Sequence, residues 1–354
     1  MEFAFSGTVP PELESFAAGL DTALKRRGYL RLEDPGSARL VLNFVDPTAP
    51  RPFRRQRKST FVASFWPAAD MPTDFVRQGY PILVRALSNL SVCVVPGQAA
   101  RFLTLEQGNY AIDWTGDGLF YDRVVDRLAP LAESTLVVDN IFTTDLEPAL
   151  WGGDETTRAI RRAGERLDAL DLLPAPFPID EILPPRDLAH VRRLYSLGGL
   201  SYGNISARHD ATRFWMSASG VDKGNLEQVG RDILLVTDYD PVRQAMCVSV
   251  PPGLEPRRVS VDAIEHWKIY REHPEVGAIV HVHAWVAGVV ATEMNFPCGT
   301  AELADAVADL VRRAEDPGRA VIGLKNHGLT ITGPDLDEIF DRVEPHILRQ
   351  VPMS

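Results

Sequence analysis

The segment VGAIVHVHAWVAGVV, residues 276–290, is the most informative stretch of the sequence. It is apolar and rich in β-branched residues, which is typical of a buried strand. His281 and His283 stand two positions apart, so a strand places both imidazoles on the same face. Two buried imidazoles are unfavourable unless both rings are hydrogen-bonded or ligated, and one metal ion satisfies both. The segment therefore predicts a strand that carries a metal site.

A third candidate ligand occurs in AVIGLKNHGLTITG, residues 320–333, where His327 follows an apolar run and precedes a glycine. Three neutral imidazole nitrogens with one open position form the catalytic type of zinc site, whereas structural zinc sites have four protein ligands. His281, His283 and His327 are therefore the predicted ligands of Zn²⁺ or another divalent metal.

A carboxylate precedes the strand in RVSVDAIEHWKIYREHPEV, residues 258–276, which has the pattern of a helix. Asp262, near its start, either enters the metal pocket as a general base or metal-proximal carboxylate, or complements the helix dipole behind the possible cap Ser260. Glu265 and His266 are further candidates in the same turn. The residues alone leave both interpretations of Asp262 open.

Two loops rich in glycine and small hydroxyl residues precede this helix: GGLSYGNISAR, residues 198–208, and FWMSASGVDKGNL, residues 214–226. Such loops can present backbone N–H groups and short side chains to an anion. The candidates for gripping a phosphate are Gly203, Asn204, Ser219 and Gly220. Ordinary turns are the alternative interpretation of both loops.

The 354 residues are enough for two domains, and five prolines in PAPFPIDEILPP, residues 174–185, mark a boundary. Prolines at this density disfavour a regular helix and predict an extended connector. The expected layout is a mixed α/β domain of open role over residues 1–173, a linker over 174–185 and the metal-binding domain over 186–354.

The first domain is predicted from short apolar runs that alternate with helical patterns. It contains no histidine and neither of the common glycine-rich nucleotide-binding motifs. The strands are expected at 2–5, 40–45, 60–65, 90–95, 100–105 and 135–138, and the helices at 13–24, 74–87 and 156–170.

Two local features of this domain have competing interpretations. RPFRRQRK, residues 51–58, could receive an acidic partner, but a solvated loop between two strands is favoured. Trp114 and Tyr121 could line a ligand pocket, but packing in the core of a hairpin is favoured.

The composition limits the class of protein. A net charge of -11 and a pI near 5.3 argue against nucleic-acid or anionic-membrane partners, which need a basic face. The three cysteines show no C-x-x-C spacing, and no segment has the apolar length of a membrane span. A soluble, cytoplasmic protein with a small-molecule substrate is expected.

Taken together, the motifs of residues 198–329 resemble those of the class II aldolase/adducin superfamily, in the same order. The motifs are GGLSYGNISAR (198–208), MSASGVDKGNL (216–226), the D-x-x-x-H start at 262–266, HVHA (281–284), CGTAELADAV (298–307) and LKNHGL (324–329).

The resemblance implies an α/β/α fold with a central, mainly antiparallel sheet. It also implies zinc on His281, His283 and His327, and substrate phosphate around Asn204, Ser219, Gly220 and Ser260. Relatives such as fuculose-phosphate aldolase and ribulose-phosphate 4-epimerase work through a metal-stabilised enediolate, usually as homotetramers. The implied activity is a zinc-dependent, aldolase-type lyase or epimerase for a small, phosphorylated sugar or hydroxy-ketone.

Two departures from the family pattern keep alternatives open. Asp262 stands where the aldolases carry glutamate, which is closer to the epimerase pattern, and the segment between His283 and His327 is shortened. That segment often supplies a further catalytic acid or base in relatives. The alternatives are a metal-dependent dehydratase or decarboxylase, and a non-catalytic, adducin-like binding or sensor protein.

Overall fold

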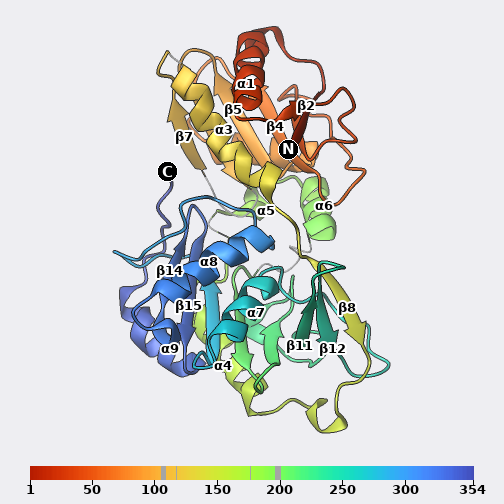
Figure 1. The fold of residues 1–354 in the computed structure, drawn as a ribbon, viewed down its shortest axis with the longest axis vertical. Coiled ribbons are helices and arrows are strands. Elements are labelled where there is room, and N and C mark those ends of the chain that lie inside the picture. The colour runs from red at the N-terminus through yellow and green to blue at the C-terminus, as the bar shows by residue number, and fades with distance from the viewer. Residues whose placement is uncertain (105–108, 117, 176, 196–200) are drawn as a thin grey trace. The chain divides into compact units, whose positions relative to one another are not determined.

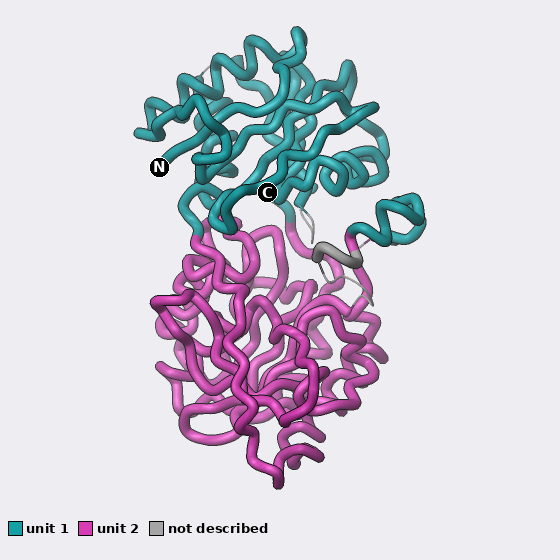
Figure 2. Tube along the Cα trace, turned by 90° about the vertical axis from the view of Figure 1, so that its right-hand side faces the viewer, with its two compact units in different colours: residues 1–134, 178–190, 353–354 teal, residues 135–177, 191–352 magenta. Residues whose placement is uncertain are grey.

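The computed structural model describes the chain except for residues 105–108, 117, 176 and 196–200. It divides into two compact units (Figure 2). Unit 1 consists of residues 1–134, 178–190 and 353–354, and unit 2 of residues 135–177 and 191–352. Both units combine β-sheets with helices, so the expected α/β class is confirmed (Figure 1).

The division differs from the expected layout, because residues 135–173 lie in unit 2. Strand β8 (Asp139–Thr143) pairs with β12 (Ala245–Ser249) of the second sheet. Helix α4 (Glu155–Ala169) contacts β9 (Asn204–Arg208) of the same sheet. The apolar face of α4 is therefore buried in the core of unit 2, and Phe142 of β8 packs against that core while partly buried.

The proline-rich segment is not the extended connector that the sequence predicts. It contains the short helix α5 (Ile179–Ile182), and helix α6 (Pro185–Tyr195) begins at its last residue. The prolines at 178 and 185 stand just before or at the first position of these helices, where a missing backbone N–H is tolerated.

Unit 1 is built on a seven-stranded sheet with the order β2-β1-β3-β4-β5-β6-β7. The first five of these strands are parallel, and β6 and β7 extend the sheet as an antiparallel hairpin. Its strands are β1 (Glu2–Ser6), β2 (Leu30–Arg31), β3 (Leu40–Phe44), β4 (Phe61–Pro67), β5 (Leu90–Val95), β6 (Ala99–Thr104) and β7 (Asn109–Asp113), and its first three α-helices are α1 (Glu14–Arg26), α2 (Phe75–Ala86) and α3 (Gly118–Glu133).

Of the two local predictions for unit 1, one agrees with the structure and the other does not. Residues 51–58 form a loop between β3 and β4, as expected. The hairpin interpretation of the aromatic pair was wrong, because Tyr121 lies in helix α3 and its ring contacts the Trp114 ring edge-on at 5.6 Å.

Unit 2 is built on an eight-stranded sheet with the order β14-β15-β13-β9-β10-β11-β12-β8. Neighbouring strands are antiparallel except β12 and β8, which are parallel. Besides β8, β9 and β12, its strands are β10 (Phe214–Ser217), β11 (Ile233–Asp240), β13 (Ala278–Val282), β14 (Val321–Leu324) and β15 (Gly328–Gly333).

The helices of unit 2 pack in two pairs. Helix α7 (Ala263–Glu272) contacts α8 (Ala301–Arg313), and α4 contacts α9 (Leu336–Val343). Their buried faces and the sheet form one hydrophobic core, with Trp215 among its largest fully buried side chains.

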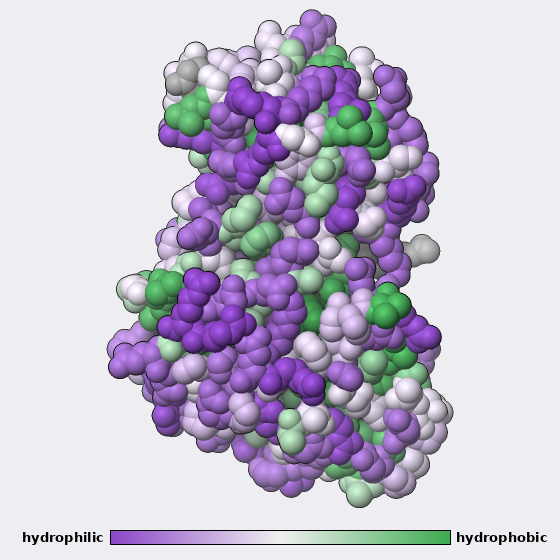
Figure 3. Space-filling model, viewed as in Figure 1, coloured by the Kyte–Doolittle hydropathy of each residue, from purple (hydrophilic) through white to green (hydrophobic). Residues whose placement is uncertain are grey.

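Hydrophobic side chains on the face shown in Figure 3 form small groups among hydrophilic ones. Within the described part of the chain, no helix combines the length and apolarity needed to cross a lipid bilayer.

A substitution at Gly164 of α4 tests whether this helix packs in unit 2. A Cβ at this position would lie only 1.9 Å from the backbone oxygen of Lys223, which belongs to unit 2. Gly164→Ala should lower the free energy of unfolding by about 1–3 kcal/mol, measured by urea denaturation, because overpacking outweighs the better helix propensity of alanine. Gly152→Ala is the control, since a Cβ at Gly152 meets no atom within 4 Å. Equal stabilities of the two variants would contradict this packing.

Candidate metal centre

Three histidines from two neighbouring strands meet at one end of the sheet of unit 2. His281 lies in β13, His283 directly follows that strand, and His327 directly precedes β15. The antiparallel register of β13 and β15 pairs His281 with Thr330, which brings His327 opposite the end of β13. The ring centroids lie 4.7–5.2 Å apart. One ligand nitrogen from each ring can therefore be chosen so that all lie within 4.8 Å of one another.

The protonation of these rings suits metal binding. His281 donates Nδ1–H to the carbonyl oxygen of Leu329 at 2.9 Å, which leaves Nε2 as a lone-pair donor. This Nε2 atom is buried and has no hydrogen-bond partner among the described residues. Burial lowers the pKa of all three rings, so each is neutral near pH 7.

The spacing of the nitrogens supports the same conclusion. The Nε2 atoms of His283 and His327 lie 3.1 Å apart. Two nitrogens bound tetrahedrally to one zinc ion at its usual bond length are separated by roughly 3.3 Å. The three histidines thus fit a divalent metal. Nε2 of His281, a buried atom with a free lone pair, would gain the ion as its partner.

Asp262 lies at the start of α7, but its carboxylate does not cap the helix. It stands at the N-cap position and makes no side-chain capping bond. Instead, Asn204 donates its side-chain N–H to Asp262 Oδ2 at 2.7 Å. Asn204 is paired in register with His281, so this bond lies beside the histidine cluster. Asp262 Oδ1 is buried and has no partner among the described residues.

A buried polar layer continues along α7, against the sheet face that carries Asn204 and His281. Thr330 donates to Glu265 Oε1 at 2.5 Å, and His266 Nδ1 lies 2.7 Å from the hydroxyl oxygen of Ser206. Burial lowers the pKa of His266 to about 3, so this ring is neutral. Glu265 and His266, the further candidates from the sequence, thus bond to Thr330 and Ser206 of the sheet.

The glycine-rich loops are only partly described, because Gly198, Gly199 and Leu200 of the first motif lie outside the described residues. Gly203 has φ of +70°, and a Cβ there would lie 2.4 Å from the carbonyl oxygen of His281. Glycine is therefore required where this loop passes β13.

The remaining predicted phosphate-binding residues lie beside one another in unit 2. Ser219 donates its backbone N–H to the carbonyl of Arg258 at 2.8 Å, and Ser260 donates to the carbonyl of Ser217 at 3.3 Å. Gly220 accepts a bond from the Arg257 guanidinium at 3.3 Å. Among the described residues, no hydrogen bond joins Ser219, Gly220 or Ser260 to the three histidines.

Two residues near the centre were not among the site residues predicted from the sequence. Cys298 Sγ lies 3.4 Å from His327 Nε2, and the Lys223 side chain is buried, with 3% of the residue exposed. Lys223 lies between the buried residues Val221 and Leu226. Its immediate neighbours in GVDKGNL are Asp222 and Gly224, so the local sequence gives no signal of this burial.

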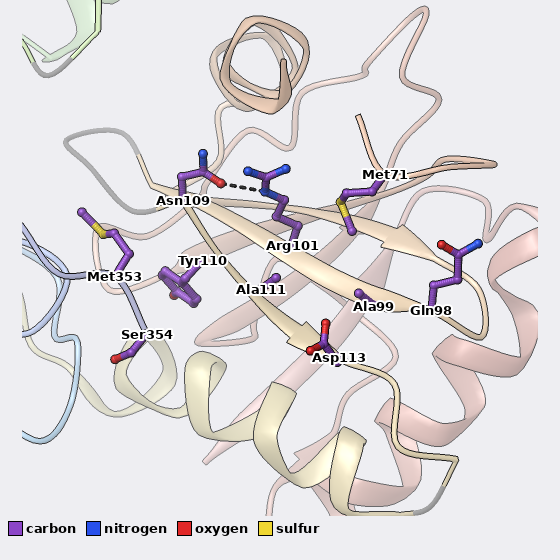
Figure 4. A pocket seen from close by; sticks show the side chains of 10 residues that line it. All are labelled: Met71, Gln98, Ala99, Arg101, Asn109, Tyr110, Ala111, Asp113, Met353 and Ser354. Atoms are coloured by element: carbon purple, nitrogen blue, oxygen red, sulfur yellow. Dashed lines mark hydrogen bonds between the residues drawn. The ribbon is translucent and has the colours of Figure 1, made fainter. Parts of the chain in front are cut away.

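Unit 1 has a separate cavity of about 580 Å³ beside strands β6 and β7 (Figure 4). In it, Arg101 donates Nε–H to the side-chain oxygen of Asn109 at 2.7 Å. Asp113 and Gln98 also line this cavity, and none of the predicted site residues does.

Metal content tests the centre directly. We expect about one zinc or similar divalent ion per chain by elemental analysis, and its loss in His281→Ala and in His327→Ala, because a ligand is removed from an open three-nitrogen site. His346→Ala is the control, since His346 lies outside the cluster. A folded wild-type protein without metal after growth with zinc would contradict the assignment.

The pH dependence of the unfolding free energy tests whether Glu265 is protonated beside Asp262 in the folded protein. Burial and the neighbouring Asp262 raise the pKa of Glu265 from 4.5 to about 8. The proton on folded Glu265 stabilises the protein fully below pH 4.5, and this stabilisation is lost as the pH rises towards 8. In metal-free protein, wild type should therefore lose roughly 1 kcal/mol of unfolding free energy per pH unit in that window relative to Glu265→Gln. Parallel pH profiles of the two proteins would contradict the shift.

With this geometry established, residues 188–298 match the family model described as the Class II Aldolase and Adducin N-terminal domain. A methylthioribulose-1-phosphate dehydratase of Granulibacter bethesdensis is 29% identical over 158 residues, which cover 43% of this chain and 65% of that protein. The protein of the same name from Pseudomonas savastanoi pv. phaseolicola is 36% identical over 87 residues, which are 25% of this chain and 37% of that protein. The matches thus span less than two thirds of either relative.

Solved structures are also similar to this chain. An L-fuculose 1-phosphate aldolase has 19% identity and a TM-score of 0.38, covering 54% of this chain and 81% of that chain. An aldolase II superfamily protein from Pseudomonas syringae has 16% identity and a TM-score of 0.35, covering 56% of this chain and 73% of that chain. The family model confirms the resemblance expected from the motifs, since residues 188–298 match the Class II Aldolase and Adducin N-terminal domain.

Proposed function

We propose that this chain is a metal-dependent lyase that acts on a small, phosphorylated ketose or hydroxy-ketone. The observation that carries the proposal is the placement of Asp262, which is buried, interacts electrostatically with His281 of the three-histidine group and keeps one oxygen without a partner among the described residues. A carboxylate in this position can take a proton from a carbon atom next to a carbonyl.

The residues around Asp262 support its role as the general base. Asn204 donates to Oδ2, which fixes the carboxylate plane and leaves Oδ1 as the oxygen for proton transfer. His281, His283 and His327 would hold the divalent ion, zinc by preference. When bound, that ion supplies Lewis-acid polarisation of a substrate carbonyl, which makes the adjacent C–H bond more acidic.

Dehydration is the reaction that we place first. The relatives from Granulibacter and Pseudomonas are named methylthioribulose-1-phosphate dehydratases. In such an elimination, Asp262 would accept the proton from carbon and the C–O bond would break on the neighbouring carbon. The hydroxyl group would leave as water after Asp262 returns that proton to its oxygen. Carbon–carbon cleavage or epimerisation starts with the same kind of base and remains the second candidate.

The substrate phosphate is proposed to lie near Asn204, Ser219, Gly220 and Ser260. Ser219 and Gly220 are partly exposed, and Ser260 stands two residues before Asp262. A phosphate in this region would hold the substrate by a group that does not react, which places its reacting carbons relative to the base. As in relatives of this family, a homo-oligomer is part of the proposal.

Asp262→Asn is the direct test. It should lower kcat for the elimination of water from methylthioribulose 1-phosphate by at least about 100-fold, because the amide cannot accept the proton. Metal content and melting temperature should remain near those of wild type. Asp309→Asn, at an exposed ion pair with Arg312 on α8, is the matched control.

The products distinguish the candidate reactions. Loss of water supports the dehydratase, whereas aldehyde release from L-fuculose 1-phosphate supports the aldolase. A folded, metal-loaded protein that transforms neither ketose phosphate would contradict the lyase proposal and favour a binding function.

A further inference from the structure

Lys223 is a buried cation that the functional proposal does not yet use. Among the described residues, it is the single lysine or arginine in the buried class, with 3% of the residue exposed. It begins the short 3-10 helix η3 (Lys223–Asn225), which follows the turn at Ser219 and Gly220 after two intervening residues, Val221 and Asp222. Burying an ammonium group is unfavourable unless it has an anionic or strongly polar partner, so its position requires a reason.

Hydrogen bonds of both the backbone and the ammonium group hold Lys223 in place. Its N–H donates to the Ser201 hydroxyl oxygen at 2.7 Å, and its ammonium donates to the Ser201 carbonyl at 2.6 Å. From the other side, Gly164 of α4 lets the helix approach the backbone oxygen of Lys223. Lys223 is therefore held on both sides, unlike a mobile surface lysine.

The hydrogen bonds of the ammonium group leave capacity for a ligand. It has three N–H donors, and Ser201 is the acceptor found within the described residues. Asp262 and Asp222 act on it electrostatically, and it forms no salt bridge with a carboxylate of the described residues. At least one donor is thus available to a further acceptor.

The charges near Lys223 keep it cationic. Its charge interacts electrostatically with Asp262, His281 and His283, so it lies in the same electrostatic environment as the candidate metal centre. Burial lowers its pKa to about 8, with Asp262 and Asp222 opposing that shift, so it remains mostly charged at neutral pH. Because the chain carries a net charge of -11, a local cation favours the approach of an anionic substrate.

We propose that Lys223 binds the phosphate oxygens of the substrate and thereby selects phosphorylated ketoses. The Ser219–Gly220 turn would provide the neighbouring hydrogen-bond donors, and Lys223 would provide the charge. The inference rests on the proposed function for the identity of the substrate. The anion site itself is testable without turnover.

The test is binding of inorganic phosphate to the full-length protein, measured by titration calorimetry at pH 7. Lys223→Met should weaken phosphate binding at least about tenfold, because a charge-assisted hydrogen bond is lost. Lys268→Met is the matched control, since Lys268 of α7 pairs with Asp305. It should bind phosphate as wild type does.

A metal ion can also bind phosphate, so His281→Ala provides a second comparison. Phosphate binding that survives in His281→Ala and is lost in Lys223→Met supports the proposal. Binding that is unchanged in a folded Lys223→Met variant, or lost in His281→Ala alone, would overturn it. If Lys223→Met does not fold, Lys223→Gln makes the same comparison, because glutamine also lacks the charge.

The two proposals fail in different ways. If Lys223 does not bind phosphate, turnover and metal content can still support the lyase. If the lyase proposal fails, phosphate binding can still depend on Lys223, because that measurement requires no reaction.

Discussion

The register of strand β13 between β9 and β15 determines the geometry of the candidate site. It pairs His281 with Asn204 on one side and with Thr330 on the other. Because side chains alternate along a strand, a shift by one residue would turn His281 away from all of these partners. The buried apolar residues of β13 oppose such a shift, since it would exchange Val280 and Val282 for polar side chains in the core. The hydrophobic core therefore fixes the positions of the metal-binding side chains.

The sequence predicted the parts of this site that depend on local spacing. His281 and His283 were predicted from their alternation in an apolar strand, and His327 from a similar run. The partner of Asp262 was not predicted, because Asn204 reaches it only through the pairing of β9 with β13. Lys223 was not predicted as a site residue because lysine side chains are normally exposed. Its burial results from the tertiary packing of α4 and of the loop that contains Ser201, which the local sequence does not reveal.

The fold was predicted unevenly for the same reason. The strands and helices of unit 1 follow from apolar runs and helical periodicity, and most lie close to the expected residues. The boundary between the units depends on which of the two sheets β8 pairs with and α4 packs against. These contacts join residues far apart in the sequence, so local patterns do not predict them. Proline content predicted an extended connector over 174–185, whereas α5 lies within this segment and α6 begins at its last residue.

The path of the chain through the two units has a consequence for its covalent integrity. Unit 2 begins before the proline-rich segment with β8 and α4, and residues 178–190 return to unit 1 before unit 2 resumes. A single cut between residues 177 and 178 would therefore leave each piece with parts of both units. The pieces would share the core around α4 and the pairing of β8 with β12, so the nicked protein would stay assembled as complementary fragments.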